Sequence, residues 1–247
     1  WLSHPDGNNP YSHARRYGMT LRQITRESIL SGETRRMAMS QAGNQLRFME
    51  DHERQAIVDK MLATKAPNES LWIFGYGSLM WNPAIHFTAR TTGQIFGHHR
   101  RFCLWSTLGR GSPENPGLML ALDRGGSCHG VVYEVAPTAA TTELDILFRR
   151  ELMTSAYRPL WTPVHLREGQ VRRAITFVID PDHDRYTHQL EEHTTVKLIA
   201  ESKGSLGRCS DYLYDTLTAL DDEGLSDKRL SKLAHLVRNH QTSNGIS

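Results

Sequence analysis

Apolar positions along the chain follow different patterns on either side of residue 66. Before that point the sequence is mostly polar, with apolar side chains at helical spacing. A first helix is predicted behind a capping box formed by Thr20 and Gln23, and Gly32 is placed to end it. A second helix is predicted over about 45–62, where the apolar stripe is thin. A thin stripe favours packing on a larger body over an independent core.

We therefore predict an N-terminal helical extension over residues 1–66 and a main domain over residues 67–247. In the main domain, short apolar runs typical of strands alternate with turns rich in glycine, proline and asparagine. The runs occupy residues 71–74, 101–105, 118–122, 130–135 and 174–179. Helical patterns occupy about 138–152, 191–202, 210–221 and 226–240. Strands first and helices late favour an α+β fold, a mixed sheet or small barrel flanked by helices, over a regular βαβ winding.

Composition narrows the class of ligand. The chain has 247 residues and 38% hydrophobic content, enough for a full core. Its 29 basic and 27 acidic residues are interspersed, so no positive field favours nucleic acid or an acidic membrane, and we expect a small-molecule partner. The three cysteines contain no CxxC pair, which fits a reducing, cytoplasmic setting. No apolar run approaches the about 18 residues of a membrane span.

Residues 71–82, LWIFGYGSLMWN, end a predicted strand with two glycines. Gly75 and Gly77 permit positive φ and close approach of the backbone to a ligand, so we expect consecutive amides there to hold a small anion. Met80 stands where a dinucleotide-binding motif needs its third glycine, so that class of site is excluded. Ser78 lacks the glycine two residues later that a nucleophile elbow requires, which makes it a binding group rather than a nucleophile.

Two polar clusters are assigned to the surface. His188 and His193 flank two glutamates in an order that resembles a helical zinc site. Two histidines five residues apart on a helix point about 140° away from each other, so we expect a solvated polar face instead. Residues 98–101, HHRR, form a basic cluster without interleaved aromatic residues and are expected to be mostly exposed.

A glutamate on an apolar helical face is the strongest candidate for proton transfer. Leu144, Phe148 and Glu151 fall at i, i+4 and i+7, so the carboxyl shares the apolar side of the predicted helix. Burial raises the pKa of a glutamate from about 4.3 toward neutrality, which suits a group that takes and returns a proton near pH 7. The alternatives are a structural ion pair with Arg149 or Arg150, and a helix that ends before Glu151 reaches the core.

The glycine turn and this glutamate occur together in one known family. The matching segments are GYGSLMWNPA at 75–84, RRFCL at 100–104, RGSPENPGLMLAL at 110–122, GVVYEV at 130–135, RRELMTSAY at 149–157 and DYLY at 211–214. In this order they resemble the ChaC-type γ-glutamylcyclotransferases, over about residues 70–235. The resemblance implies a mixed β-barrel flanked by helices. It also implies an enzyme without metal or cofactor that splits glutathione into 5-oxoproline and cysteinylglycine.

The resemblance also implies roles for particular residues. The expected pocket for the γ-glutamyl α-carboxylate consists of Tyr76, Gly77, Ser78 and Leu79. Glu151 is the expected general acid/base, and no nucleophile is needed because the substrate's own α-amine closes a five-membered ring on the γ-carbonyl. Arg100 and Tyr212 match family positions and are expected to line the pocket, with a structural arginine and a core tyrosine as the alternatives.

The sequence departs from the family pattern at two positions. His98 stands where tryptophan is usual, and Cys209 stands where asparagine is usual. Two other functions stay open: a cyclotransferase for other γ-glutamyl amines or amino acids, and a non-catalytic protein that binds a γ-glutamyl ligand or regulates another protein. The presence of Glu151 argues against the second. For residues 1–66, packing on the barrel, self-association and partial disorder are all open.

Overall fold

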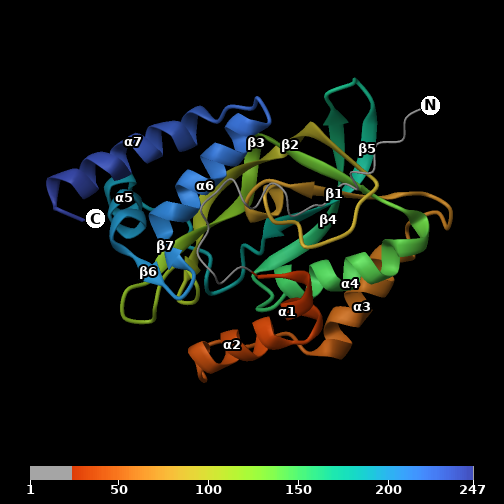
Figure 1. The fold of residues 1–247 in the computed structure, drawn as a ribbon, viewed down its shortest axis with the longest axis horizontal. Helices are drawn as coiled ribbons and strands as arrows, with labels where there is room; N and C mark the ends of the chain where they lie inside the picture. The colour runs from red at the N-terminus through yellow and green to blue at the C-terminus, as the bar shows by residue number, and fades with distance from the viewer. Residues whose placement is uncertain (1–23, 247) are drawn as a thin grey trace, which may run out of the picture.

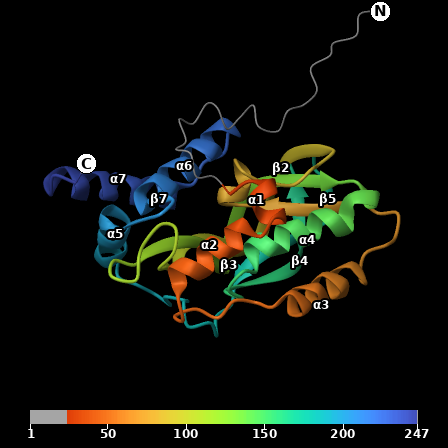
Figure 2. The same ribbon diagram turned by 60° about the horizontal axis from the view of Figure 1, so that its bottom comes forward.

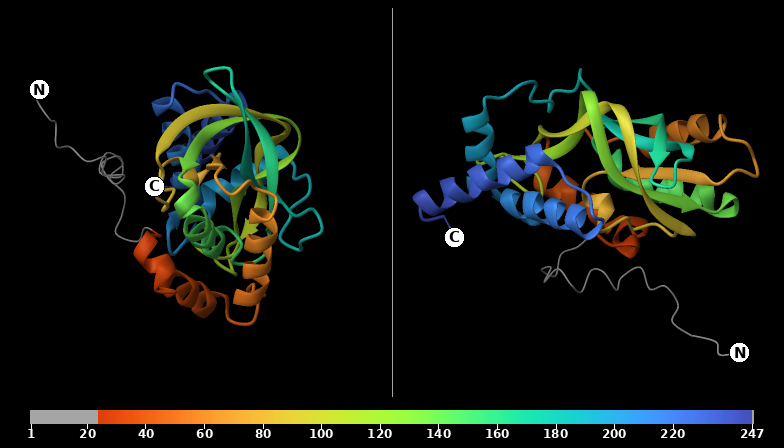
Figure 3. Two further views of the ribbon diagram at one scale, coloured as in Figure 1. Left: turned by 90° about the vertical axis from the view of Figure 1, so that its right-hand side faces the viewer. Right: turned by 90° about the horizontal axis from the view of Figure 1, so that it is seen from above.

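The structure, a computed structural model, describes residues 24–246 of the chain. At its centre is a closed five-stranded β-barrel, which confirms the expected mixed barrel (Figure 1). Helices flank this barrel, and Figures 1 and 3 show the first three helices and the last helix on opposite sides of it. Within residues 24–246, no helix combines the length and the apolar character that a membrane span requires.

The barrel strands are β1 (Leu71–Gly75), β2 (Ala89–Ser106), β3 (Gly117–Val135), β4 (Tyr157–Leu166) and β5 (Val171–Ile179). They follow the order β1-β3-β2-β4-β5, and parallel pairing of β1 with β5 closes the barrel. The other pairs in this order are antiparallel, and β3 also makes a short parallel contact with β5. Ile73 of β1 shows the closure, because it lies opposite Tyr133 on one side and Ile175 on the other. Outside the barrel, β6 (Lys203–Gly204) and β7 (Gly207–Arg208) form a short hairpin.

Each predicted strand lies within a strand of the structure, but the predicted segments are shorter than the strands that contain them. Residues 101–105 are only the end of β2, and the runs at 118–122 and 130–135 both belong to β3. Strand β4 was not predicted, since Pro159 and Pro163 interrupt its apolar pattern. Both prolines are tolerated because β4 pairs with β5 along its length but with β2 only at its end. Most of one edge of β4 has no partner strand, so no ladder hydrogen bond there requires the N–H that proline lacks.

The helices are α1 (Arg26–Leu30), α2 (Glu33–Ala42), α3 (Asp51–Leu62), α4 (Ala140–Glu151), α5 (Glu192–Glu201), α6 (Cys209–Asp222) and α7 (Lys228–Ser243). Two short 3-10 helices are η2 (Ser78–Met80) and η3 (Pro137–Ala139). The four late helical patterns are confirmed as α4 to α7. The capping box expected at Thr20 and Gln23 lies outside the described residues, and α1 begins with one formed by Thr25 and Ser28.

The extension differs from its prediction in two places. Gly32 follows the end of α1, as expected, and has φ +73°. It is also the N-cap of α2, a helix that was not predicted. The second predicted helix starts at Asp51 rather than near residue 45, because Glu50 and Glu53 form a capping box there. Since the apolar spacing continues upstream of that box, periodicity alone placed the helix start too early.

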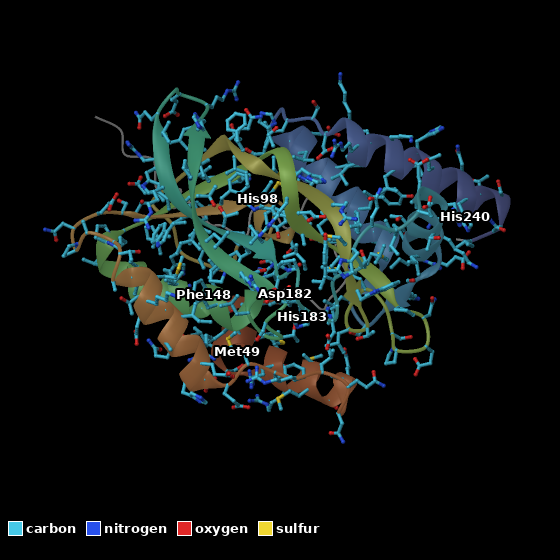
Figure 4. The ribbon with its side chains drawn as sticks, turned by 180° about the vertical axis from the view of Figure 1, so that it is seen from behind. Met49, His98, Phe148, Asp182, His183 and His240 are labelled. Carbon is cyan, nitrogen blue, oxygen red and sulfur yellow. The ribbon has the colours of Figure 1, made fainter. Side chains whose placement is uncertain are left out.

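The extension packs on the barrel through α4. Val58 and Met61 of α3 are buried in the same core cluster as Phe148 of α4. The amide of Met49 donates to the carbonyl of Met153 at 2.9 Å, and Figure 4 shows Met49 below Phe148. The part of the extension that the structure describes is therefore a layer over α4, while the boundary at residue 66 stays a prediction.

Candidate active site

Gly75, the last residue of β1, and Gly77 allow other residues to pack closely against the backbone. Neither uses the positive φ that glycine permits: φ of Gly77 is −133°, and Gly75 is not among the glycines with positive φ. A Cβ on Gly75 would stand 2.9 Å from Cβ of Leu79, and one on Gly77 would stand 2.6 Å from Oη of Tyr212. Glycine is therefore required here because another part of the protein approaches the backbone.

The carbonyl groups of η2 face the barrel wall. Oη of Tyr133 donates to the carbonyl oxygen of Leu79 at 2.7 Å and to that of Met80 at 3.1 Å. Nη2 of Arg90 donates to the same Met80 oxygen at 3.2 Å. Among the residues that the structure describes, the amides of Gly77 and Leu79 donate to no backbone carbonyl. The turn thus satisfies its acceptors and leaves donors available, as an anion-binding nest does.

Glu151 is the last residue of α4, and its side chain is only 14% exposed. Leu144 and Phe148 on the same face are fully buried, so the predicted position of the carboxyl on the apolar face is confirmed. Burial raises the pKa of Glu151, and the charge of Arg150 offsets part of that rise. A carboxyl in this position holds its proton to higher pH than a solvated glutamate.

Arg150 connects the carboxyl to the glycine turn. Its Nε lies 3.0 Å from Oε1 of Glu151, and its Nη2 donates to Oγ of Ser78 at 2.8 Å. Its Nη1 donates to the carbonyl of Asn82. The ion pair that the sequence offered as an alternative is therefore present, made by Arg150, whereas Arg149 pairs with Asp145. The pair coexists with a raised pKa, so it does not exclude proton transfer.

Three tyrosines lie near the carboxyl: Tyr76 and Tyr212, which are buried, and Tyr157, which is half-buried. The charge of Glu151 is among the causes that raise the pKa values of Tyr76, Tyr157 and Tyr212, which puts all three phenols near it. Burial is the largest cause for each, and it raises the pKa of Tyr212 to about 12 although a hydrogen bond with the Ser78 backbone acts the other way. All three phenols therefore stay protonated at neutral pH and are able to donate hydrogen bonds.

Most of the predicted site residues come together, and one is held by other partners. The structure brings the glycine turn, Tyr212 and Glu151 to one place. Arg100 is buried and donates to the carbonyl of His129 and to Sγ of Cys128, with its Nε 3.5 Å from Oδ2 of Asp227. None of these partners belongs to the turn or to α4, so a pocket role for Arg100 stays a prediction.

Sequence reasoning did not select two residues of this group. Arg150 was considered only as a partner of Glu151, because nothing in the sequence relates it to Ser78. Tyr157 lies at the start of β4, the strand that was not predicted. Its position six residues after Glu151, within the segment RRELMTSAY, was the one signal available.

The two unusual positions lie in the framework rather than beside Glu151. Sγ of Cys209 donates to the carbonyl of Leu118 at 3.0 Å and accepts from its amide at 3.4 Å. This contact fixes the first turn of α6 on β3, three residues before Tyr212. His98 is half-buried on β2, where burial lowers its pKa, and Figure 4 shows it well apart from Phe148 of α4.

The cluster at 188–193 forms no site. His188 and His193 are exposed, as predicted for a solvated polar face. Across residues 24–246, no group of three or more histidine, cysteine, aspartate or glutamate side chains could hold a metal ion.

Comparison with known proteins gives consistent matches. Residues 71–240 match the protein family described as ChaC-like protein. The glutathione-specific gamma-glutamylcyclotransferase of Escherichia coli (strain K12) is 40% identical over 186 residues, which cover 75% of this chain and 80% of that protein. Gamma-glutamylcyclotransferase 2-3 of Arabidopsis thaliana is 30% identical over 179 residues, which cover 68% of this chain and 89% of that protein. A crystal structure described as a γ-glutamyl cyclotransferase specific to glutathione from yeast has a TM-score of 0.63 and 25% identity, covering 70% of this chain and 97% of that one.

Proposed function

This chain belongs to the ChaC-like protein family, and we propose that it is a γ-glutamylcyclotransferase that cleaves glutathione into 5-oxoproline and cysteinylglycine. The similarity to the Escherichia coli enzyme supports the glutathione assignment, since it extends over most of both chains. Glu151 is the proposed general acid/base. The loop formed by residues 76–79 is the proposed pocket for the α-carboxylate of the γ-glutamyl group.

The reaction needs orientation and proton transfer rather than a nucleophile from the enzyme. The α-amine of the substrate attacks its own γ-carbonyl carbon and forms the C–N bond of a five-membered ring. The amide C–N bond to cysteinylglycine then breaks. The Glu151 carboxylate takes a proton from the α-ammonium group before the attack and returns it to the leaving nitrogen as the amide bond breaks. The second proton, which the ring nitrogen carries after the attack, leaves by the same carboxylate, so cysteinylglycine departs as an ammonium group and 5-oxoproline keeps one N–H. A carboxyl whose pKa is raised toward neutrality suits both steps.

The observation that carries this proposal is the bridge made by Arg150 between Ser78 and Glu151. The α-carboxylate and the α-amine of the substrate are attached to one carbon atom. A loop that holds the carboxylate therefore also sets the position of the amine. Because one guanidinium contacts both Ser78 of this loop and the carboxyl of Glu151, the amine of a bound γ-glutamyl group lies within reach of its base.

The protonated phenols supply the remaining part of the proposed mechanism. The γ-carbonyl oxygen gains negative charge as the amine attacks, and hydrogen-bond donors aimed at that oxygen stabilise the transition state. Tyr212 is our first candidate donor, because its Oη lies against Gly77 and its pKa of about 12 keeps it protonated. Tyr76 is a second protonated phenol near Glu151, whereas the hydroxyl of Tyr157 already donates to the carbonyl of Leu120 at 2.8 Å.

We further propose a cytoplasmic enzyme whose partner is its small-molecule substrate. Cys103, Cys128 and Cys209 are free and buried, which fits a reducing compartment. The net charge of +2 gives no field that would attract nucleic acid. Residues 67–247 are the proposed catalytic domain and residues 1–66 its extension.

A direct assay tests the proposed function. Purified protein is incubated with glutathione, and 5-oxoproline and cysteinylglycine are measured by chromatography. We expect the two products in equal amounts. If glutathione gives no product but protects the protein against heat, the protein is a non-catalytic γ-glutamyl binder. If only other γ-glutamyl compounds are cleaved, the glutathione assignment is wrong.

A further inference from the structure

Helix α1, together with Ile24 just before its N-cap, contacts the helix that carries Glu151 and the segment that follows η2, although both lie far from it in the sequence. Figure 2 shows α1 beside α4, the helix that carries Glu151. Arg26 of α1 donates two hydrogen bonds to Glu143 of α4, from Nη1 to Oε2 at 2.5 Å and from Nη2 to Oε1 at 2.8 Å. Only 13% of the Arg26 side chain and 3% of the Glu143 side chain are exposed. A bidentate pair shielded from water in this way fixes the relative placement of its two helices.

The same carboxylate also holds the segment that follows η2. The backbone amide of His86 donates to Oε2 of Glu143 at 3.0 Å. His86 lies between η2 and β2, so Glu143 joins three parts of the chain: α1, α4 and the segment leaving the glycine turn. Loss of Arg26 would leave this nearly buried carboxylate without its cationic partner.

A second link starts at Ile24, which lies just before the N-cap of α1, and leads to the proposed catalytic groups through Asn82. Nδ2 of Asn82 donates to the carbonyl of Ile24 at 2.9 Å. The backbone amide of Asn82 donates to the Ser78 carbonyl at 2.9 Å, and its own carbonyl accepts from Nη1 of Arg150. Arg150 in turn contacts Ser78 and Glu151. Ile24, just before α1, is thus connected to the glycine turn through Asn82, and to the base through Asn82 and Arg150.

We propose that α1 is a positioning element of the active site. Through Arg26 and the Ile24 carbonyl it holds α4 and the turn in the arrangement in which Arg150 bridges Ser78 and Glu151. This inference rests on the proposed function and gives the extension a role in it. A five-residue helix is too short to be stable alone, so the contacts that position the site also hold α1 in place.

Substitutions in the two links test the proposal. Arg26→Met removes the ion pair at similar volume, and Asn82→Ala removes the hydrogen bond to Ile24 while keeping the backbone contact with Arg150. We expect each to lower kcat/KM for glutathione by about tenfold, because small displacements of reacting groups have large effects on rate. We also expect the acid limb of the pH profile to move to higher pH as Arg150 loosens from Glu151. Arg26→Lys should restore part of the activity.

A matched control separates positioning from loss of stability. Val58→Ala creates a cavity in the core beside α4 and touches neither link. It should lower the Tm and leave kcat/KM and the pH profile unchanged at temperatures well below unfolding. The double variant Arg26→Met/Glu143→Leu removes the stranded carboxylate and should recover stability without recovering activity.

The outcomes are decisive in either direction. If the parent protein cleaves glutathione while Asn82→Ala and the double variant keep its kcat/KM within about twofold and its pH profile, the positioning role is wrong and the proposed function stands. If Arg26→Met does not fold, these two variants decide alone. If the parent protein itself releases no product, the proposed function fails first.

Discussion

The phenol of Tyr212 lies so close to the backbone of Gly77 that a methyl group there would stand 2.6 Å from its oxygen. Gly77→Ala must therefore displace the Tyr212 side chain or the turn. We predict that KM for glutathione rises by about tenfold, equivalent to about 1.4 kcal/mol. The thermal shift that glutathione produces should shrink with it.

A second-site variant checks the cause of that effect. Tyr212→Phe removes the clashing oxygen, so Gly77→Ala/Tyr212→Phe should bind glutathione better than Gly77→Ala alone. A glutathione-induced shift in Tm that Gly77→Ala leaves intact would mean that the carboxylate binds elsewhere.

Arg150→Met should affect binding and proton transfer together. Loss of the contact with Ser78 should raise KM. Because the charge of Arg150 lowers the pKa of Glu151, its removal should raise that pKa further and move the acid limb of kcat/KM to higher pH. Arg149→Met is the matched control, since Arg149 pairs with Asp145 instead. Equal pH profiles for the two variants would contradict the bridge.

The raised pKa of Glu151 predicts how stability changes with pH. At pH 4 the carboxyl is largely protonated in the folded protein and near its midpoint, about 4.3, in the unfolded chain. As the pH rises through that value, the unfolded chain loses the proton before the folded protein does, and stability falls until the folded carboxyl also ionises. Glu151→Gln should therefore have a higher Tm than the parent at pH 7.5, and the difference should shrink toward pH 4. A lower Tm at pH 7.5 would show that the charged carboxyl is favourably held.

Substrate analogues test which groups the site grips. N-acetylated glutathione lacks the nucleophilic amine and should be inert. On the proposed function, glutathione should have a higher kcat/KM than γ-glutamylalanine or γ-glutamyl-ε-lysine, because the similar Escherichia coli protein is named as specific for glutathione. Side-by-side assays decide this, and a higher kcat/KM with either of the other two would overturn the glutathione preference while leaving the cyclisation mechanism intact.

The sequence predicted the position of a candidate site residue correctly where that position followed from the helical spacing of neighbouring apolar residues. The spacing of Leu144, Phe148 and Glu151 placed the carboxyl on the apolar face of α4 without any tertiary information. The turn after β1 was located equally well from its two glycines. The reason for Gly77 could not be predicted from the sequence, because glycine is needed there to leave room for Tyr212, which lies more than a hundred residues away.

Contacts between distant segments were beyond local patterns. The bond from Arg150 to Ser78 joins two segments separated by the β2–β3 hairpin, and only the closed barrel brings them together. Strand β4 was missed because Pro159 is tolerated in a strand only where one edge has no partner strand. Which edges lack a partner depends on how the whole barrel pairs, and the local sequence does not show that.

The central claim is that Glu151 transfers the proton. Glu151→Gln keeps the shape and hydrogen bonding of the side chain and removes its ability to accept a proton, and general acid/base groups contribute about 10²- to 10⁴-fold to rate. The most direct measurement is the kcat of this variant on glutathione, taken together with the thermal shift that glutathione produces. We predict a loss of kcat in that range with the thermal shift retained. A kcat within about threefold of the parent protein would contradict the account.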